Sequence, residues 1–109
     1  MVYLVGGYKL TREQVLEWCR PRDLHPPPGN TTVYVNRWLR HHGIKQTRLL
    51  ACGYRGETIY LVVTNRRIDS NGTPDKFEPF EESERERQIK KLLELDEIDF
   101  VTVPNPYGS

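Results

Sequence analysis

The sequence predicts a small α+β domain on the basis of three observations. Short runs of β-branched and aromatic residues recur between segments that carry turn signals. Other stretches begin with helix-capping patterns and continue with apolar residues at helical spacing. The chain has 109 residues, of which 37% are hydrophobic and 28% charged. This composition predicts one hydrophobic core and a single domain over residues 1–109.

The first strand and the first helix follow one another closely. Residues 2–5 form an apolar run that a Gly-Gly pair ends, which predicts a strand. Thr11 and Gln14 have the spacing of a capping box, so a helix is expected to start there. Pro21 stops this helix, because the residue before a proline avoids the α region. The proline-rich segment 21–30 is expected to be a loop.

A second helix is expected directly after this loop. Val35, Trp38, Leu39 and His42 recur at i, i+3, i+4 and i+7, which places them on one helical face. Gly43 follows as the residue that ends the helix in a left-handed conformation.

A hairpin is predicted next. Residues 47–54 and 57–64 read as strands joined by a tight turn at Arg55 and Gly56. The run 58–63, TIYLVV, does not alternate between apolar and polar residues. A strand of this kind has both faces covered, which raises the question of what covers the second face.

The rest of the chain is a connection, a helix and a strand. Segment 65–79 carries turn signals and is long for a loop in a compact domain. Ser83 and Glu86 form a second capping-box pattern, and acidic residues crowd the first turns of the predicted helix. Residues 98–103 read as a last strand, and residues 104–109 are expected to be a flexible tail.

The order of elements predicts an architecture. If the first two helices act as one crossover, the order is β-α(α)-β-β-α-β, which is that of the ferredoxin-like folds. This arrangement is a four-stranded antiparallel sheet with helices on one face. The first and third strands are then central, and they are the two most apolar strands of this chain.

The helix-free face would carry an apolar patch that monomers rarely leave bare. The residues expected there are Tyr3, Val5, Tyr60, Val62 and Phe100, although the alternation alone does not say which side chains face outward. A second copy of the chain is the favoured cover, which predicts a homodimer. The alternative covers are the 65–79 connection, the tail or a ligand.

The charges of the chain are unevenly distributed. Residues 9–55 contain nine Lys or Arg and three Asp or Glu, whereas residues 56–109 contain seven and twelve. If the two halves segregate in space, the surface is polarised. Arg37, Arg40 and Arg48 are the candidates for a secondary polar contact with a partner.

RNA binding is an alternative function. The β-α-β-β-α-β order is also that of the RNA recognition motif, which stacks bases on aromatic residues of its central strands. Residues 2–7, VYLVGG, resemble the first-strand motif of that family, with Tyr3 at the stacking position. Arg55 resembles the opening of the third-strand motif. The resemblance implies a single-stranded RNA ligand, but Glu57 and Ile59 stand where the family has aromatic residues.

A small enzyme of the dimeric α+β barrel type is the second alternative. Such an enzyme would use one of the three histidines, or Tyr3 or Tyr60, for proton transfer. His41 and His42 are adjacent on a helix and point about 100° apart, so they cannot share a pocket. His25 lies in the proline loop. No phosphate loop, nucleophile elbow or zinc-ligand spacing is present, and no cofactor or metal is expected.

The sequence also allows predictions about the cellular location of the protein and the redox state of its two cysteines. Cys19 and Cys52 are expected to be free thiols. No signal peptide and no membrane-length apolar run are visible in this sequence, so a cytoplasmic or nuclear protein that is not secreted is expected. The most direct prediction is therefore a non-enzymatic module that works by association.

Overall fold

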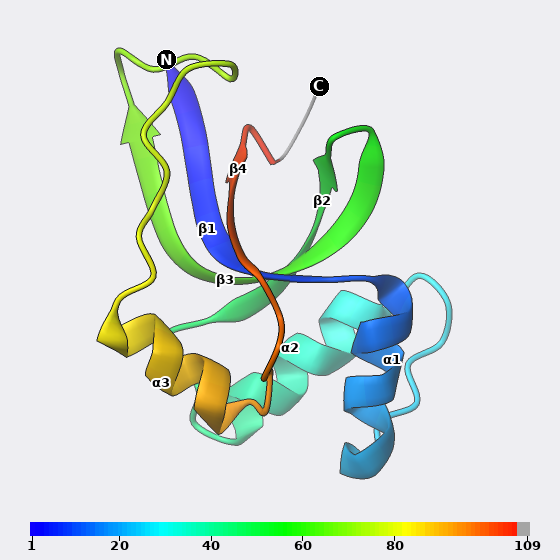
Figure 1. Cartoon of the computed structure of the whole chain (residues 1–109). Helices are drawn as coiled ribbons and strands as arrows, with labels where there is room; N and C mark the ends of the chain where they lie inside the picture. The colour runs from blue at the N-terminus through cyan, green and yellow to red at the C-terminus, as the bar shows by residue number, and fades with distance from the viewer. Residues whose placement is uncertain (107–109) are drawn as a thin grey trace.

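The computed structural model describes residues 1–106. Within this part of the chain the fold is mixed α+β, with a four-stranded antiparallel sheet and three α-helices (Figure 1). The elements are β1 (Val2–Leu10), α1 (Arg12–Cys19), a 3-10 turn (Arg20–Arg22), α2 (Thr31–His41), β2 (Arg48–Tyr54), β3 (Glu57–Asp69), α3 (Glu84–Leu92) and β4 (Phe100–Pro104). The sheet order is β2-β3-β1-β4, so the first and third strands are central, as expected.

The local helix signals are confirmed. Thr11 accepts a hydrogen bond from the Gln14 amide at 3.1 Å, and the Gln14 side chain accepts one from the Thr11 amide at 2.8 Å. At the end of α2, Gly43 has φ 75°, and the Ile44 amide donates to the Leu39 carbonyl at 2.8 Å. These are the reciprocal bonds of a capping box and the long-range bond of a Schellman ending.

The two central strands are longer than predicted, because the Gly-Gly pair does not end β1. The register of β1 with β3 shifts between Gly6 and Gly7, where Thr64 is an extra residue in β3. A Cβ atom on Gly7 would lie 2.0 Å from the carbonyl oxygen of Val62. Glycine is needed here because two backbones approach closely, and β3 then continues through the polar residues up to Asp69.

The first core lies between the lower half of the sheet and the helices. All three helices lie on the same side of the sheet in Figure 1. Tyr8, Leu10 and Val62 from the sheet pack in one buried cluster with apolar residues of α1, α2 and α3. Trp18 and Trp38 pack against this cluster, with their rings edge to face at 5.2 Å.

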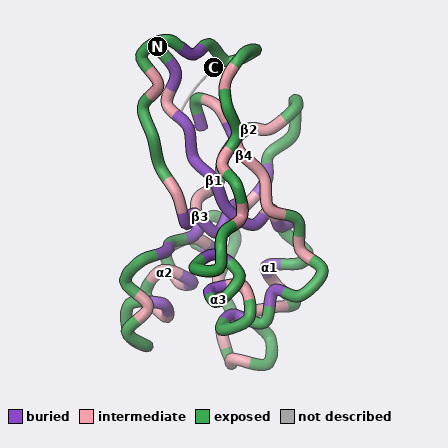
Figure 2. The backbone as a smooth tube through the Cα atoms, turned by 60° about the vertical axis from the view of Figure 1, so that its left-hand side comes forward, coloured by how far each residue is buried: buried purple, intermediate pink, exposed green. Residues whose placement is uncertain are grey.

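The second face of the sheet is covered by the sheet itself. Figure 1 shows the upper half of the sheet curled, so that the β2–β3 hairpin rises opposite β1 and β4. The concave side holds a second buried cluster of Val5, Cys52, Ile59, Leu61, Val63 and Val103. Val5, Leu61 and Val103 are each 0% exposed, and Figure 2 shows β1 buried along nearly its whole length. The lack of alternation in TIYLVV therefore reflects two cores, one on each side of β3.

The five residues predicted for an exposed second face do not share a face. Tyr3 and Val5 belong to the concave cluster, whereas Tyr60, Val62 and Phe100 belong to or pack against the helix-side cluster. The reason is register. Strand pairing brings odd-numbered residues of β1 and β4 together on the concave side, with odd-numbered residues of β3 up to Val63 and even-numbered ones beyond the bulge at Thr64. Alternation within single strands does not reveal such pairing.

The long connection after β3 covers the outer side of the upper sheet. A Cβ atom on Gly6 would lie 2.6 Å from the Phe80 ring, so this ring rests on the β1 backbone. The Phe80 amide donates to Thr102 Oγ1 at 2.9 Å, and the Arg67 guanidinium lies 4.8 Å from the Phe80 ring centroid. The connection is therefore attached to β1, β3 and β4.

The start of the predicted flexible tail is ordered. Pro104 belongs to β4, Pro106 is buried, and the Asn105 amide donates to the Tyr3 carbonyl at 2.7 Å. Residues 104–106 thus contact the sheet, and the remainder of the predicted tail, 107–109, lies outside the described residues.

Candidate functional site

The edge strand β2 has one capped end and one open end. In the hairpin register, Leu49, Ala51 and Gly53 direct their backbone N–H and C=O groups away from β3. The Asn36 side chain of α2 accepts from the Leu49 amide at 2.6 Å and donates to the Leu49 carbonyl at 2.9 Å. Ala51 and Gly53 are exposed and leave the upper edge open.

Beside the capped end lie two adjoining hollows with basic linings. One is lined by Val33, Asn36, Arg40, Ile44, Lys45, Thr47 and Arg48. The other is lined by Lys45, Gln46, Thr47, Arg48, Val63, Thr64 and Arg66. Neither lining contains an Asp or Glu, and residues 24–56 contain none at all. Positive charge therefore accumulates on this surface although the net charge of the chain is only +1.

Two of the three predicted polar-contact residues lie together here. Arg40 and Arg48 line the hollows, while Arg37 is exposed on the same helix with its guanidinium 5.6 Å from the Tyr34 ring centroid. Lys45 and Arg66 complete the surface. Arg66 was missed because residues 65–69 read as a loop. We name these residues the basic band: Arg37, Arg40, Lys45, Arg48 and Arg66. Within the described part of the chain, none of them forms an ion pair.

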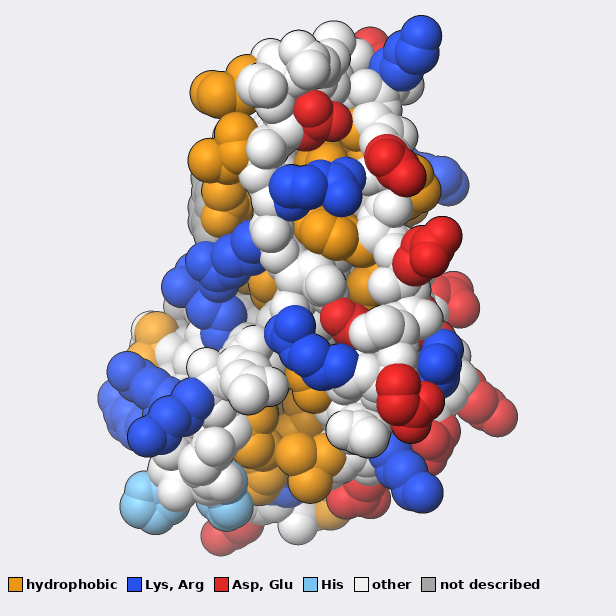
Figure 3. Space-filling model, turned by 90° about the vertical axis from the view of Figure 1, so that its left-hand side faces the viewer, with side chains coloured by type: hydrophobic (Ala, Val, Ile, Leu, Met, Phe, Trp, Pro, Cys, Tyr) orange, Lys and Arg blue, Asp and Glu red, His pale blue; other side chains and the backbone are white. Residues whose placement is uncertain are grey.

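An acidic surface lies beside the basic band. The segment 78–84 contains four glutamates and no Lys or Arg, and we name it the acidic band. Glu78 and Glu81 are exposed and have no ion-pair partner among residues 1–106. In Figure 3 most Asp and Glu side chains lie on the right of one face, whereas Lys and Arg side chains lie along its left margin, in its middle and among the acidic side chains. The acidic side chains of this face are thus gathered together, whereas the basic side chains are segregated from them only in part.

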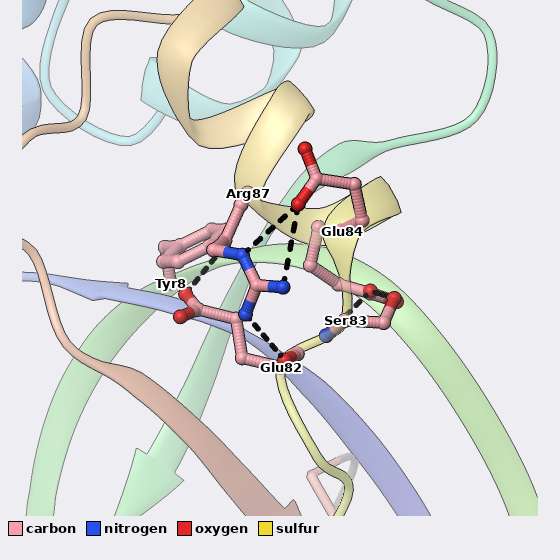
Figure 4. A network of polar contacts seen from close by, with 6 residues as sticks. Tyr8, Glu82, Ser83, Glu84 and Arg87 are labelled. Carbon is pink, nitrogen blue, oxygen red and sulfur yellow. Dashed lines mark hydrogen bonds and ion pairs between the residues drawn. The ribbon is translucent and has the colours of Figure 1, made fainter.

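A polar network anchors the acidic band to the sheet (Figure 4). The Tyr8 hydroxyl donates to Glu82 Oε2 at 2.7 Å, and Tyr8 is 0% exposed. Burial, followed by the hydrogen bond to Glu82, raises the pKa of Tyr8 well above its usual range. Arg87 donates to the Glu82 carbonyl at 3.0 Å and pairs with Glu84 at 3.3 Å. These contacts hold the connection where it enters α3.

Glu86 belongs to the same anchor and is only 2% exposed. Burial alone would raise its pKa, but hydrogen bonds from Ser83, Asn65 and backbone amides outweigh burial and lower the pKa. Ser83 donates to Glu86 through both its amide and its hydroxyl. The carboxylate is thus a buried, hydrogen-bonded helix cap rather than an acid group open to a substrate.

The residues considered for catalysis are not gathered in a pocket. His25 is exposed and pairs with Asp23 at 3.0 Å, and His42 stacks on Trp38 with ring centroids 3.8 Å apart. The void between sheet and helices measures about 20 Å³ and is lined only by apolar side chains, among them Val62 and Trp18. Such a void has room for about one water molecule and contains no polar group that could hold a ligand.

The tryptophans serve the packing of helices. The Arg22 guanidinium lies 4.0 Å from the Trp18 ring centroid and donates to the Trp18 carbonyl at 2.7 Å. Trp18 Nε1 and Arg22 both donate to the Leu93 carbonyl, at 2.8 and 3.4 Å. This cluster ties α1 to the end of α3.

Comparisons with known proteins identify no relative of the chain. No family model matches the chain, and neither the curated proteins nor the solved structures include a significant match. Among residues 1–106 no group of three or more His, Cys, Asp or Glu side chains is placed to hold a metal ion. The helices in this range are all too short or too polar to cross a membrane.

Proposed function

We propose that the chain is a small association module of ferredoxin-like architecture that pairs with a second copy of itself through its charged face. The sheet order with β1 and β3 central supports this architecture, and the strong curl of the sheet is its particular feature. The observation that carries the functional proposal is the juxtaposition of the basic band and the acidic band on one face.

The proposed contact differs from the one expected from the sequence. Most of the apolar second face is buried within the chain, so it offers little surface to a second copy. The charged face is exposed, and Figure 3 shows hydrophobic side chains at the surface in its middle, next to Lys and Arg side chains. An interface here would have apolar contacts flanked by charge pairs, which is the usual arrangement of a protein interface.

Twofold symmetry makes the charged face complementary to itself. If two copies meet face to face about a twofold axis that runs parallel to the bands, each basic band lies opposite the acidic band of the other copy. Every contact then occurs twice, as in any isologous dimer. Exposed ion pairs contribute only about 0.2–1 kcal/mol each, so the dimer is expected to dissociate on dilution and in salt.

A charge-swap experiment tests the proposal. We expect the double variant R40E/R48E to be monomeric, because its basic band keeps three positive charges against two negative ones and loses most of its attraction to the acidic band. The variant E78R/E81R should also be monomeric, because two Arg neutralise the two Glu that remain in its acidic band. Mixing the two variants should restore part of the dimer of twice the 12.8 kDa chain mass, because one contact of the mixed pair is again between an unmodified basic band and an unmodified acidic band. The measurement is light scattering across concentration at low and high salt.

The control is R12E/R20E, which changes the net charge equally at two exposed arginines of α1 and the turn after it. This variant should dimerise like the unmodified chain. If the mixed swap variants stay monomeric, or if R40E/R48E alone still dimerises, the charged face is not the interface.

Single-stranded nucleic acid is a second candidate partner, and the acid-free basic band is the observation that favours it. Tyr3 supports it less than the sequence suggested, because Tyr3 packs on the concave cluster. A nucleic-acid ligand would bind R40E/R48E more weakly, and its affinity would fall steeply with salt. Binding of a labelled oligonucleotide by the monomeric E78R/E81R variant, and not by R40E/R48E, would favour this partner over a second copy.

A further inference from the structure

Two unpaired strand edges face the same open groove in the upper half of the molecule. On β2, Ala51 and Gly53 direct their backbone groups away from β3. On β4, Asp99 and Asn105 form backbone hydrogen bonds with β1, so the odd-numbered residues of this strand direct their backbone groups toward β1. Thr102 is even-numbered and directs its backbone groups away from the sheet. Gly53 and Thr102 line one groove, together with part of the 65–79 connection.

The walls of this groove suit a peptide backbone with apolar side chains. The lining includes the aromatic rings of Tyr54 and Phe77, the side chain of Val101 and three prolines. Gly53 has no side chain, and a Cβ atom there would meet nothing within 4 Å. Another backbone can therefore approach β2 closely at this position.

The charges near the open edge favour an acidic partner. β2 contains no Asp or Glu, and exposed arginines stand at its two ends, Arg48 in the first position and Arg55 in the turn. The opposite wall carries both Asp75 and Lys76, whose charges compensate each other.

We propose that the upper edge of β2 binds an extended peptide segment of a partner protein, in which acidic and apolar residues alternate. The segment adds as a fifth strand and bonds to the N–H and C=O groups of Ala51 and Gly53. Its apolar side chains lie on the concave side, where Leu50 and Tyr54 are located. Its acidic side chains lie toward solvent within reach of Arg55.

A second copy of β2 is a poor occupant of this edge. Antiparallel pairing of two β2 strands would bring the Arg48 end of one strand beside the Arg55 turn of the other. Like charges that face each other across strands are destabilising. The proposed site uses the backbone groups of Ala51 and Gly53, which belong to neither charged band. The proposal therefore does not depend on self-association.

Hydrogen exchange with a model peptide tests the proposal. The probe is a blocked hexapeptide of alternating glutamate and valine, added to the monomeric E78R/E81R variant and to the unmodified chain. At a peptide concentration of about ten times Kd, we expect the Ala51 and Gly53 amides to exchange about tenfold more slowly. Leu49 is the internal reference, because Asn36 already bonds its amide.

Two control peptides separate strand addition from charge attraction. The first carries N-methyl groups on the residues whose N–H and C=O groups face β2. The methyl groups remove the donors of that edge and keep its carbonyl groups away from the Ala51 and Gly53 amides, so this peptide should give no protection. The second replaces glutamate by lysine and should bind more weakly. Equal protection by the N-methylated peptide, or no protection of Ala51 and Gly53 by the first probe, overturns the proposal. Protection that appears without peptide and grows with protein concentration would assign this edge to a second copy instead.

Discussion

Asn36 occupies the edge of β2 at Leu49 as a neighbouring strand would. Its side-chain amide bonds both the N–H and the C=O of Leu49, at 2.6 and 2.9 Å. A helix thereby supplies the hydrogen bonds that an edge strand otherwise seeks from another chain. This contact also joins α2 to β2, and so it positions Arg40 and Arg48 on either side of the same hollow.

Replacement of Asn36 should weaken the fold and lengthen the open edge. We expect Asn36→Ala to lower the free energy of unfolding by about 1–3 kcal/mol, because two backbone groups lose their partners. Val33→Ala, at a 47% exposed position of the same helix, is the control and should change it by less than about 1 kcal/mol. Urea unfolding measures both, and equal effects would mean that the Asn36 contact contributes little.

The close approach of strands at Gly7 predicts a severe effect of a single methyl group. Gly7→Ala places a Cβ atom 2.0 Å from the Val62 carbonyl oxygen, so the two central strands must separate. We expect a loss of about 3 kcal/mol of unfolding free energy. Gly53→Ala is the matched control, since a Cβ atom there is unobstructed, and it should stay within about 0.5 kcal/mol. A tolerated Gly7→Ala would contradict the described register.

The buried tyrosine predicts a loss of stability in alkali. The pKa of Tyr8 is raised by burial and by Glu82 above its usual value of 10.0. A raised pKa means that the folded state holds the proton more tightly. The resulting stability is complete below pH 10 and is lost as the pH rises toward the folded-state pKa.

Tyr8→Phe should therefore flatten the decline of stability above pH 10. It should also cost about 1–3 kcal/mol at neutral pH, because Glu82 loses its hydrogen bond. Tyr60→Phe is the control, since Tyr60 packs on the same core without a hydrogen bond from its hydroxyl among the described residues. Thermal unfolding between pH 7 and 11 makes the comparison, and parallel curves for Tyr8→Phe and the unmodified chain would refute it.

The lowered pKa of Glu86 predicts a loss of stability in acid, as the raised pKa of Tyr8 predicts one in alkali. Its pKa is lowered in the fold from the usual value of 4.5, because hydrogen bonds outweigh burial. A lowered pKa stabilises the fold above pH 4.5, and this stability is lost as the pH falls through the folded-state pKa. We expect Glu86→Gln to be less stable at neutral pH and less sensitive to acid. Glu17→Gln, at an exposed glutamate of α1 outside the acidic band, is the control and should change the free energy of unfolding by less than about 0.5 kcal/mol.

The two thiols should react only when the chain opens. Cys19 and Cys52 are 1% and 4% exposed, and burial raises the pKa of each thiol. The reactive thiolate is therefore scarce as well as inaccessible. An aromatic disulfide reagent should label both cysteines slowly in buffer and rapidly in denaturant. Rapid labelling of one cysteine in buffer would show local opening of the core that contains it.

The helix boundaries could be predicted from the sequence because they depend on hydrogen bonds between nearby residues. A capping box such as Thr11 with Gln14 satisfies backbone groups within one turn, and Gly43 ends α2 by its own left-handed conformation. These features depend on neighbours in sequence. The Gly-Gly pair led to a wrong prediction of where the first strand ends, because glycine often follows a strand. Here glycine is needed at Gly7 because Val62 of a distant strand approaches the backbone closely.

The sequence by itself determined the elements, their order and the uneven distribution of charge, since each depends on residue type and short-range spacing. The tertiary structure decided which side chains share a face, because strand register sets that relation and a bulge at Thr64 alters it. It also decided that the second face is buried, through curling of the sheet. The basic band exists only because residues far apart in sequence, such as Arg40 and Arg66, meet on one surface.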